Sequence, residues 1–103
     1  MTSKAILKLL GGMERVKEVC KKTADRYGVG IEAALHRNEA DPTDRRGDFL
    51  NIVFTIARYD GDYEQYLKAG MAINRWLMKK ELHLSLECTG DGERGTEMSF
   101  RVA

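Results

Sequence analysis

The sequence predicts an α+β fold, a two-layer sandwich in which a four-stranded antiparallel sheet carries two helices on one face. Three observations lead to this prediction: two stretches with apolar residues at helical spacing, a pair of alternating strands after each stretch, and Gly- or Asp-rich turns between elements. The element order is therefore αββαββ. The 103 residues are expected to form a single domain, 1–103.

Residues 3–10 predict a first helical stretch that ends at Gly11–Gly12, and a helical pattern resumes at Met13. Because the apolar stripe of 13–27 extends backward to Ile6 and Leu9, residues 3–27 can also form one helix with a weak middle at the two glycines. Ser3 is the expected N-cap, and the apolar residues of 13–27 recur every three to four positions, which is the spacing of one helix face. A short strand over residues 5–10 is the alternative for the N-terminal part. Helix is favoured there because Lys, Ala and Leu are good helix formers.

The next two elements predict a first hairpin. Residues 29–36 alternate between apolar and small or polar side chains, as a half-buried strand does. A polar loop at 37–48 holds the only proline, and residues 49–59 read as a long strand rich in β-branched and aromatic residues. The core-facing side chains of this second strand are expected to be Leu50, Ile52, Phe54 and Ile56.

A second helix is expected after a turn at Asp60–Gly61. Asp62 and Gln65 have the spacing of a capping box, and two lysines fall in the last turn, where the helix dipole favours positive charge. One apolar stripe runs along this helix. Its members are Tyr66, Gly70, Ile73 and Leu77, widened by Leu67, Met71 and Met78.

The C-terminal residues predict a second hairpin with one buried face. Period-two alternation runs through two segments that flank a Gly-rich turn at 90–95. The buried face is expected to hold Leu82, Leu84, Leu86, Cys88, Met98, Phe100 and Val102.

Two hairpins joined by a helical crossover can form one sheet in the strand order 3-4-2-1. This order topologically resembles a ferredoxin-like sandwich whose first strand has moved to the end. If residues 5–10 formed a strand, the standard ferredoxin-like order would result, with an added C-terminal strand. Both arrangements are two-layer α+β sandwiches.

Charge is distributed unevenly although its sum is small. The net charge of +1 implies no global attraction to nucleic acid or membranes, but residues 1–27 hold seven basic and three acidic residues. No apolar run approaches the roughly 20 residues of a membrane span, and no signal-peptide core is visible. Cys20 and Cys88, both expected on buried faces, predict two reduced thiols and a cytoplasmic location.

Residues that carry catalysis or bind metals do not converge in this sequence. His36 and His83 fall on the open sheet face, whereas both cysteines are expected in the core, so a zinc site is not expected. The paired carboxylates lie in turns beside Gly or Pro, where Asp serves local backbone hydrogen bonding. No serine or cysteine has an activating neighbour. An enzyme is therefore the least supported class, and no cofactor is expected.

Three regions are candidates for binding a partner. The open sheet face carries more apolar side chains than a solvated surface requires. Arg45–Arg46 lies at the tip of a long loop, which is either plainly solvated or pairs with acidic side chains or phosphates. Trp76 is either part of the core edge or an interface anchor. The candidate contact residues are Arg45, Arg46, Phe49, Val53, Tyr59, Trp76 and Arg101.

The sequence thus favours a non-enzymatic protein-binding module, a small adaptor or inhibitor of a larger assembly, with pairing into a homodimer as one form of binding. The alternative is a nucleic-acid-binding domain, because exposed aromatic side chains of an open sheet can stack bases and the first helix is basic. Against it, Glu32, Glu87 and Glu97 share that face and would repel phosphates. A small enzyme or ligand-binding domain with a pocket between helix and sheet is a weaker third alternative, because no residue selects a substrate.

Overall fold

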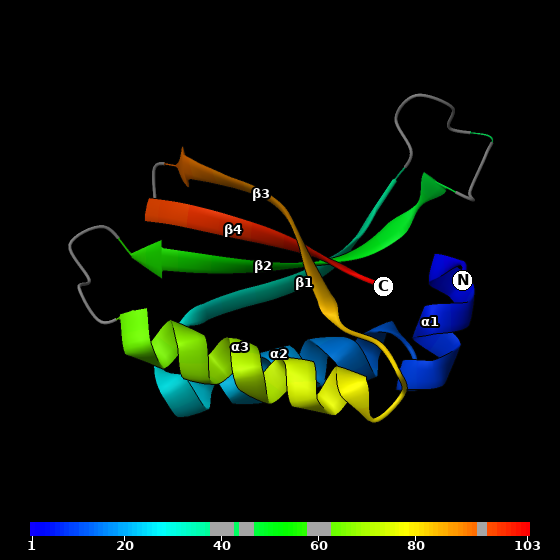
Figure 1. The fold of residues 1–103 in the computed structure, drawn as a ribbon, viewed down its shortest axis with the longest axis horizontal. Coiled ribbons are helices and arrows are strands. Elements are labelled where there is room, and N and C mark those ends of the chain that lie inside the picture. Colours follow the sequence, from blue (N-terminus) through cyan, green and yellow to red (C-terminus); the bar gives the residue numbers. More distant parts are fainter. Residues whose placement is uncertain (38–42, 44–46, 58–62, 93–94) are drawn as a thin grey trace.

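A computed structural model of the chain describes residues 1–37, 43, 47–57, 63–92 and 95–103. The four strands in these ranges form one antiparallel sheet, and Figure 1 shows the helices together on one side of it. The predicted two-layer α+β class is confirmed, with three helices in the described part instead of two. The elements are α1 (Ser3–Leu10), α2 (Met13–Tyr27), β1 (Gly30–His36), β2 (Phe49–Ala57), α3 (Tyr63–Met78), β3 (Leu84–Gly92) and β4 (Gly95–Val102).

The sheet has the strand order β1-β2-β4-β3, and each neighbouring pair is antiparallel. Read from the other edge, this is the 3-4-2-1 order expected from two hairpins joined by a helix. β4 pairs with β2 at the centre of the sheet, so β1 and β3 are the edge strands. The central pair sets Ile52 opposite Phe100 and Phe54 opposite Met98.

The N-terminal region forms two helices, so the predicted end of the first helical stretch at Gly11–Gly12 is confirmed. The continuous helix over 3–27 and the strand alternative for 5–10 are wrong. The break lies at Gly11 and Gly12, whose φ angles of 91° and 98° belong to a region that L side chains rarely adopt. Gly11 ends α1 as a left-handed C-cap, with its N–H directed to the carbonyls of the preceding turn. The N-cap is Thr2, not Ser3, because the Thr2 hydroxyl accepts a hydrogen bond from the Ala5 amide at 3.2 Å.

The hydrophobic core fills the space between the sheet and the helices. α2 packs on β1, α3 packs on β2 and beside α2, and α1 contacts α2 and β2. The four positions expected to face the core on β2 are all buried, which confirms the alternation there. The largest fully buried side chains are Phe54, Leu50, Ile52, Ile73, Leu77, Val16, Val102 and Cys20.

The C-terminal hairpin departs from the expected alternation at a β-bulge between Leu86 and Cys88. Leu86 pairs with Phe100, but Cys88 pairs with Ser99, so one extra residue has entered β3 and the side-chain parity reverses. Cys88 is therefore exposed, and its expected place on the buried face is wrong. The strand also runs on to Gly92, through residues expected to belong to the turn.

On α3 the predicted apolar stripe divides into a buried part and an exposed part. Tyr66, Ile73 and Leu77 are buried, whereas Leu67, Met71 and Met78 are exposed because the described chain covers only one flank of the helix. The expected capping residue Asp62 lies outside the described residues. Neither α3 nor any other helix within the described residues combines the length and apolarity of a membrane span.

Candidate functional site

An apolar groove runs between α3 and the hairpin of β3 and β4, on the helix-bearing side of the sheet. Its volume is about 710 Å³. We call it the α3–hairpin groove. Six of its lining residues come from α3 and seven from the strands: Tyr63, Tyr66, Leu67, Gly70, Met71 and Asn74, with Phe54, Ile56, Leu84, Thr89, Thr96, Met98 and Phe100.

Large apolar side chains are exposed in and around this groove. Tyr63, Leu67, Met71 and Met78 on α3 and Leu86 on β3 have exposed fractions between 57% and 67%. Leu86 pairs with the groove residue Phe100, and the Sδ of Met78 lies 3.6 Å from the Nδ2 of the groove residue Asn74. Folded proteins rarely leave this much contiguous apolar surface in water unless a partner covers it.

The groove-facing side of α3 is free of charge. At about 100° per residue, the groove residues of α3 and the exposed Met78 fall within about two fifths of the helix circumference. The helix charges Glu64, Lys68 and Arg75 fall outside that sector, on the solvent side away from the sheet. α3 therefore carries two apolar faces, one against β2 and one that lines the groove.

Two hydrogen bonds fix the walls of the groove. The Tyr66 hydroxyl donates to the Thr55 carbonyl at 2.7 Å and ties the first half of α3 to β2. Near the other end, the Leu84 amide donates to Oδ1 of Asn74 at 3.0 Å and ties α3 to the start of β3. Because both ends are pinned, the groove has its shape before anything binds, which reduces the entropy lost on binding.

The chemistry of the groove favours binding over catalysis. Apart from two tyrosines, its described lining contains no titratable side chain. Its polar groups are two threonines and one asparagine. Nor do His, Cys, Asp and Glu side chains gather in threes anywhere in the described ranges in a way that could hold a metal ion. Acid–base catalysis needs a positioned proton donor or acceptor, so what this surface offers is apolar contact area.

The open face of the sheet has a different character, because its side chains already bind one another. Phe49 stacks on His36 with ring centroids 4.7 Å apart, and the Arg101 guanidinium carbon lies 4.0 Å from the Phe49 centroid. Arg101 Nε also forms an ion pair with Glu87 at 3.1 Å, although its N–H is not aligned for a hydrogen bond. Phe49 is thus covered from both neighbouring strands.

The predicted contact residues do not gather at one place. Phe49, Val53 and Arg101 lie together on the open sheet face, as their strand parity predicts. Trp76 lies on α3 instead, half-buried and packed against the core. Arg45, Arg46 and Tyr59 lie outside the described residues.

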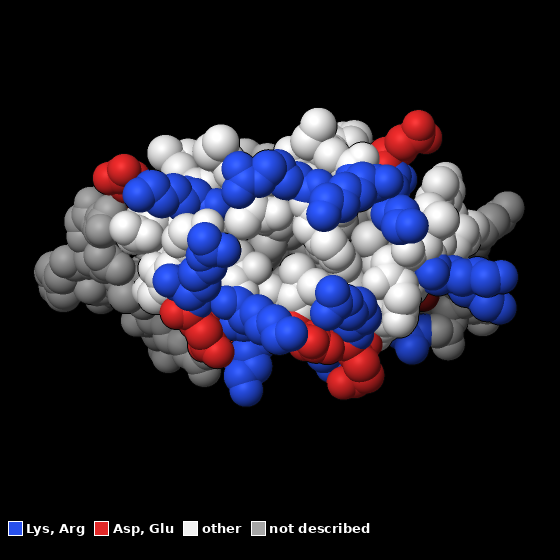
Figure 2. Space-filling view, turned by 90° about the horizontal axis from the view of Figure 1, so that it is seen from below, with Lys and Arg blue, Asp and Glu red and all other residues white. Residues whose placement is uncertain are grey.

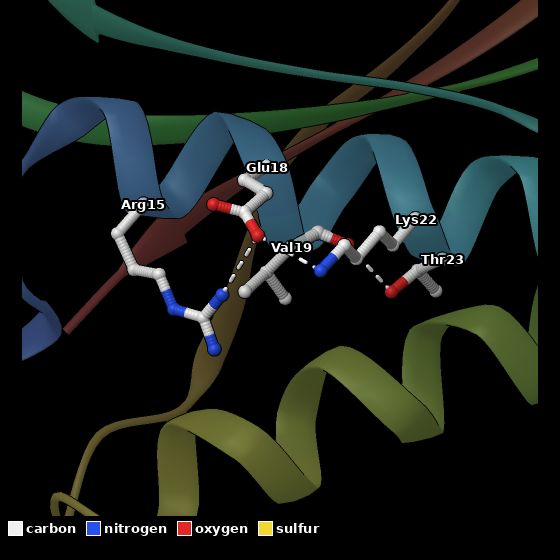
Figure 3. A network of polar contacts seen from close by, with 5 residues as sticks. All are labelled: Arg15, Glu18, Val19, Lys22 and Thr23. Atoms are coloured by element: carbon white, nitrogen blue, oxygen red, sulfur yellow. Dashed lines mark hydrogen bonds and ion pairs between the residues drawn. The ribbon is translucent and has the colours of Figure 1, made fainter.

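The outer face of the helices is basic. Residues 1–27 and 63–81 hold eleven Lys and Arg against five Asp and Glu, and Figure 2 shows the basic side chains spread over this face. On α2, Glu18 binds both Arg15 and Lys22, at 3.2 Å and 2.8 Å (Figure 3). The hydrogen bond from Lys22 and the charges of both cations lower the pKa of the Glu18 carboxyl. One carboxylate is thus shared by two cations, and the cluster stays positive.

The sequence predicted a pocket between helix and sheet only for the ligand-binding alternative, and it assigned no residues to that pocket. The signal for the α3–hairpin groove was present in the extra width of the apolar stripe on α3. A stripe that faces the core and a stripe that faces an open groove have the same periodicity. Only the sheet order and the position of α3 over β2 show that Leu67 and Met71 lack a cover among the described residues.

The chain was also compared with known proteins. No protein-family model, no curated protein and no solved structure matches it.

Proposed function

We propose that this chain is a non-enzymatic protein-binding module, an adaptor or inhibitor that binds a partner protein through the α3–hairpin groove. The observation that carries this proposal is the group of exposed large apolar side chains, centred on Leu67 and Met71, around a preformed apolar groove. Such surfaces are typical of protein-protein interaction sites. The cytoplasmic location remains a prediction that rests on the free thiols.

The open sheet face is the less favoured binding surface for this function. Phe49 already has a ring on one side and a guanidinium on the other, and the Ser99 hydroxyl donates to Oδ1 of Asn51 at 2.7 Å. A partner would have to replace these contacts before it gained its own. The groove offers apolar area with no such contacts to break.

Quantitative capture from an extract of the source organism tests the proposal. We expect the tagged chain to enrich one protein, Met71→Glu to lose at least about 90% of it, and Val53→Lys to retain it. Met71 is exposed on α3 between two cations, so glutamate there leaves the fold intact. Val53→Lys is the matched control, because it changes the open face beside Glu32.

Two outcomes of the capture experiment would contradict the proposal. Equal loss in both variants would move the interface to the open sheet face or point to general misfolding, which circular dichroism of the variants separates. If no protein were enriched above the level seen with untagged beads, the proposal that the groove binds a partner protein would be contradicted.

Nucleic-acid binding is the second candidate function, and the basic outer face of the helices is the observation that favours it (Figure 2). This differs from the stacking platform expected on the open sheet face. Fluorescence anisotropy with mixed oligonucleotides tests it. Binding through this face would weaken steeply as salt rises, and a reversal of charge such as Lys21→Glu with Lys22→Glu would weaken it further. Affinity that is unchanged by salt would exclude this mode.

A further inference from the structure

We propose that the occupant of the α3–hairpin groove is one amphipathic α-helix of a partner protein, about three turns long, with acidic side chains along the flank that lies next to α3. This inference rests on the proposed protein-binding function and specifies the partner's chemistry. It follows from the width of uncovered sheet, the lack of backbone partners in the groove, and the charges beside it.

The uncovered part of the sheet is one helix wide. α2 packs on β1 and α3 on β2, so within the described residues no helix lies over the helix-bearing side of β4 and β3. Strands lie about 4.8 Å apart, and the distance from β2 to β3 is therefore about 10 Å, which equals the usual spacing of packed helices. A partner helix beside α3 would therefore cover β4 and β3 and extend the helical layer that α2 and α3 form over β1 and β2.

The groove suits a helix better than an extended segment. A strand needs hydrogen-bond partners for its own backbone, whereas a helix satisfies its backbone internally. Three polar side chains of the groove already have partners: Asn74 Oδ1 accepts from the Leu84 amide, the Thr96 hydroxyl donates to Asp91 at 3.0 Å, and the Tyr66 hydroxyl donates to the Thr55 carbonyl. Extended segments are instead expected at the edge strands β1 and β3, outside the groove.

Gly70 has no side chain on the groove-facing side of α3, so another helix can approach the α3 backbone closely there. Gly70 lies one helical turn from the groove residues Leu67 and Asn74, and a Cβ added to it would meet nothing within 4 Å. Small residues let two helix axes approach closely, with the larger side chains on either side as knobs. From Tyr63 to Asn74 the wall extends about 17 Å, which matches about three helical turns.

Charges beside the groove select the polar flank of the occupant. Arg75 lies one helical turn from both Met71 and Met78, and it forms no ion pair with another described residue. Lys68 is paired with Glu64 at 3.4 Å. A helix in the groove would place one flank beside these cations. Glu or Asp on that flank would be attracted to them, whereas Lys or Arg would be repelled.

A second copy of this chain is a poorer occupant than a partner helix. α3 has its own sheet on one side and Glu64, Lys68 and Arg75 on the opposite side. To fill the groove of another copy, α3 must either bring the two sheets into collision or bury those charges against apolar strands. Burying charged groups without matched partners is unfavourable.

Three synthetic peptides of about 14 residues test the inference by titration calorimetry and by methyl NMR of the intact chain. The first is a helix with Leu on one face and Glu elsewhere, the second has two central prolines, and the third carries Lys in place of Glu. We expect the first to bind with a Kd of about 100 µM or below and to shift the methyl signals of Leu67, Met71 and Met98. The proline peptide should bind at least about tenfold more weakly. The Lys peptide should also bind more weakly at low salt, with a difference that shrinks at high salt.

A graded series at Gly70 separates binding from folding. Gly70→Ala and Gly70→Leu should weaken the Glu peptide progressively, by at least about tenfold for Leu, while the thermal stability of the free chain stays level or rises. Ala34→Leu adds bulk to the exposed opposite face of the sheet and should leave the affinity unchanged.

The possible failures have different meanings. If the helical and proline peptides bound equally, or if neither bound, the proposal of a helical occupant would be wrong. Met71-dependent capture would still support the groove as the binding site of another kind of partner segment. Loss of Met71-dependent capture would overturn the groove as well. A dimer in sedimentation experiments that Met71→Glu dissociates would replace the partner helix with a second copy.

Discussion

The two cysteines of this chain have opposite surroundings, which makes them direct reporters of residue-level structure. Cys20 is buried on the core-facing side of α2, and Cys88 is exposed on the open sheet face beyond the bulge of β3. At pH 8, iodoacetamide should modify Cys88 within minutes and Cys20 only when the chain is unfolded with urea. Peptide mass spectrometry identifies the modified residue. Equal protection of both thiols would show that Cys88 lies on the helix-bearing side and that the bulge is absent.

Burial of Cys20 also makes stability depend on pH. Burial raises the pKa of the Cys20 thiol from 9.0 to about 11. Because the folded chain holds this proton more tightly than the unfolded chain, the stabilising effect is complete below about pH 9 and is lost as pH rises through about 11. Its full size is about 3 kcal/mol, because each tenfold change in proton affinity is worth roughly 1.4 kcal/mol.

The variant Cys20→Ala separates the pH dependence that Cys20 causes from that of the lysines and tyrosines, which ionise in the same pH range. The difference in unfolding free energy between the natural chain and the variant, measured in urea, should shrink between pH 8 and pH 11. A difference that stays constant with pH would mean that the thiol is not desolvated.

Leu86 and Cys88 also mark where sequence reasoning failed at the residue scale. Alternation assigned both to the buried face, because period-two patterns carry no information on an inserted residue. The bulge moved Cys88 to the other face. Leu86 kept its side of the sheet, but no described helix lies over it.

At the scale of elements, the sheet and most helix positions could be predicted, because they follow from alternation and helical periodicity over long segments. The strand order followed from hairpins and a helical crossover. The division of the N-terminal helix could not be fixed in the same way. Gly11–Gly12 is compatible with a weak helix interior as well as with a break, and the choice depends on whether Ile6 and Leu10 reach the core.

That break gives an element-scale prediction. Gly11→Ala and Gly12→Ala should each lower the unfolding free energy by about 1–2 kcal/mol, because their φ angles of 91° and 98° strain a residue with a Cβ. A double variant that joined α1 and α2 would also pull Ile6 and Leu10 out of the core. Urea unfolding measures the loss, with Gly70→Ala on α3 as a control that should be neutral or stabilising. Unchanged stability in the Gly11 variant would mean that the break is not required.

At the scale of the whole molecule, three surfaces with different chemistry surround one core. On the open sheet face, side chains contact one another through ring stacking and an ion pair. The outer face of the helices is basic, and the α3–hairpin groove is apolar. The sequence pattern can indicate that a surface is basic or apolar. It cannot indicate which of these surfaces the rest of the chain leaves uncovered. That depends on how two helices of given length lie across four strands, which is a tertiary property.

The uncovered groove predicts that stability and surface function are separable in this molecule. Replacing the exposed Leu67 or Met71 by Ser should change the unfolding free energy by no more than about 0.5 kcal/mol. Ile73→Ala, two residues beyond Met71 on the same helix but fully buried, should cost about 2–5 kcal/mol. The free protein should bind an apolar dye such as anilinonaphthalene sulfonate, and the double variant Leu67→Ser with Met71→Ser should reduce that fluorescence without loss of near-ultraviolet dichroism. A loss of several kcal/mol in the Leu67 or Met71 variants would show that these side chains belong to the core and that the groove is closed in solution.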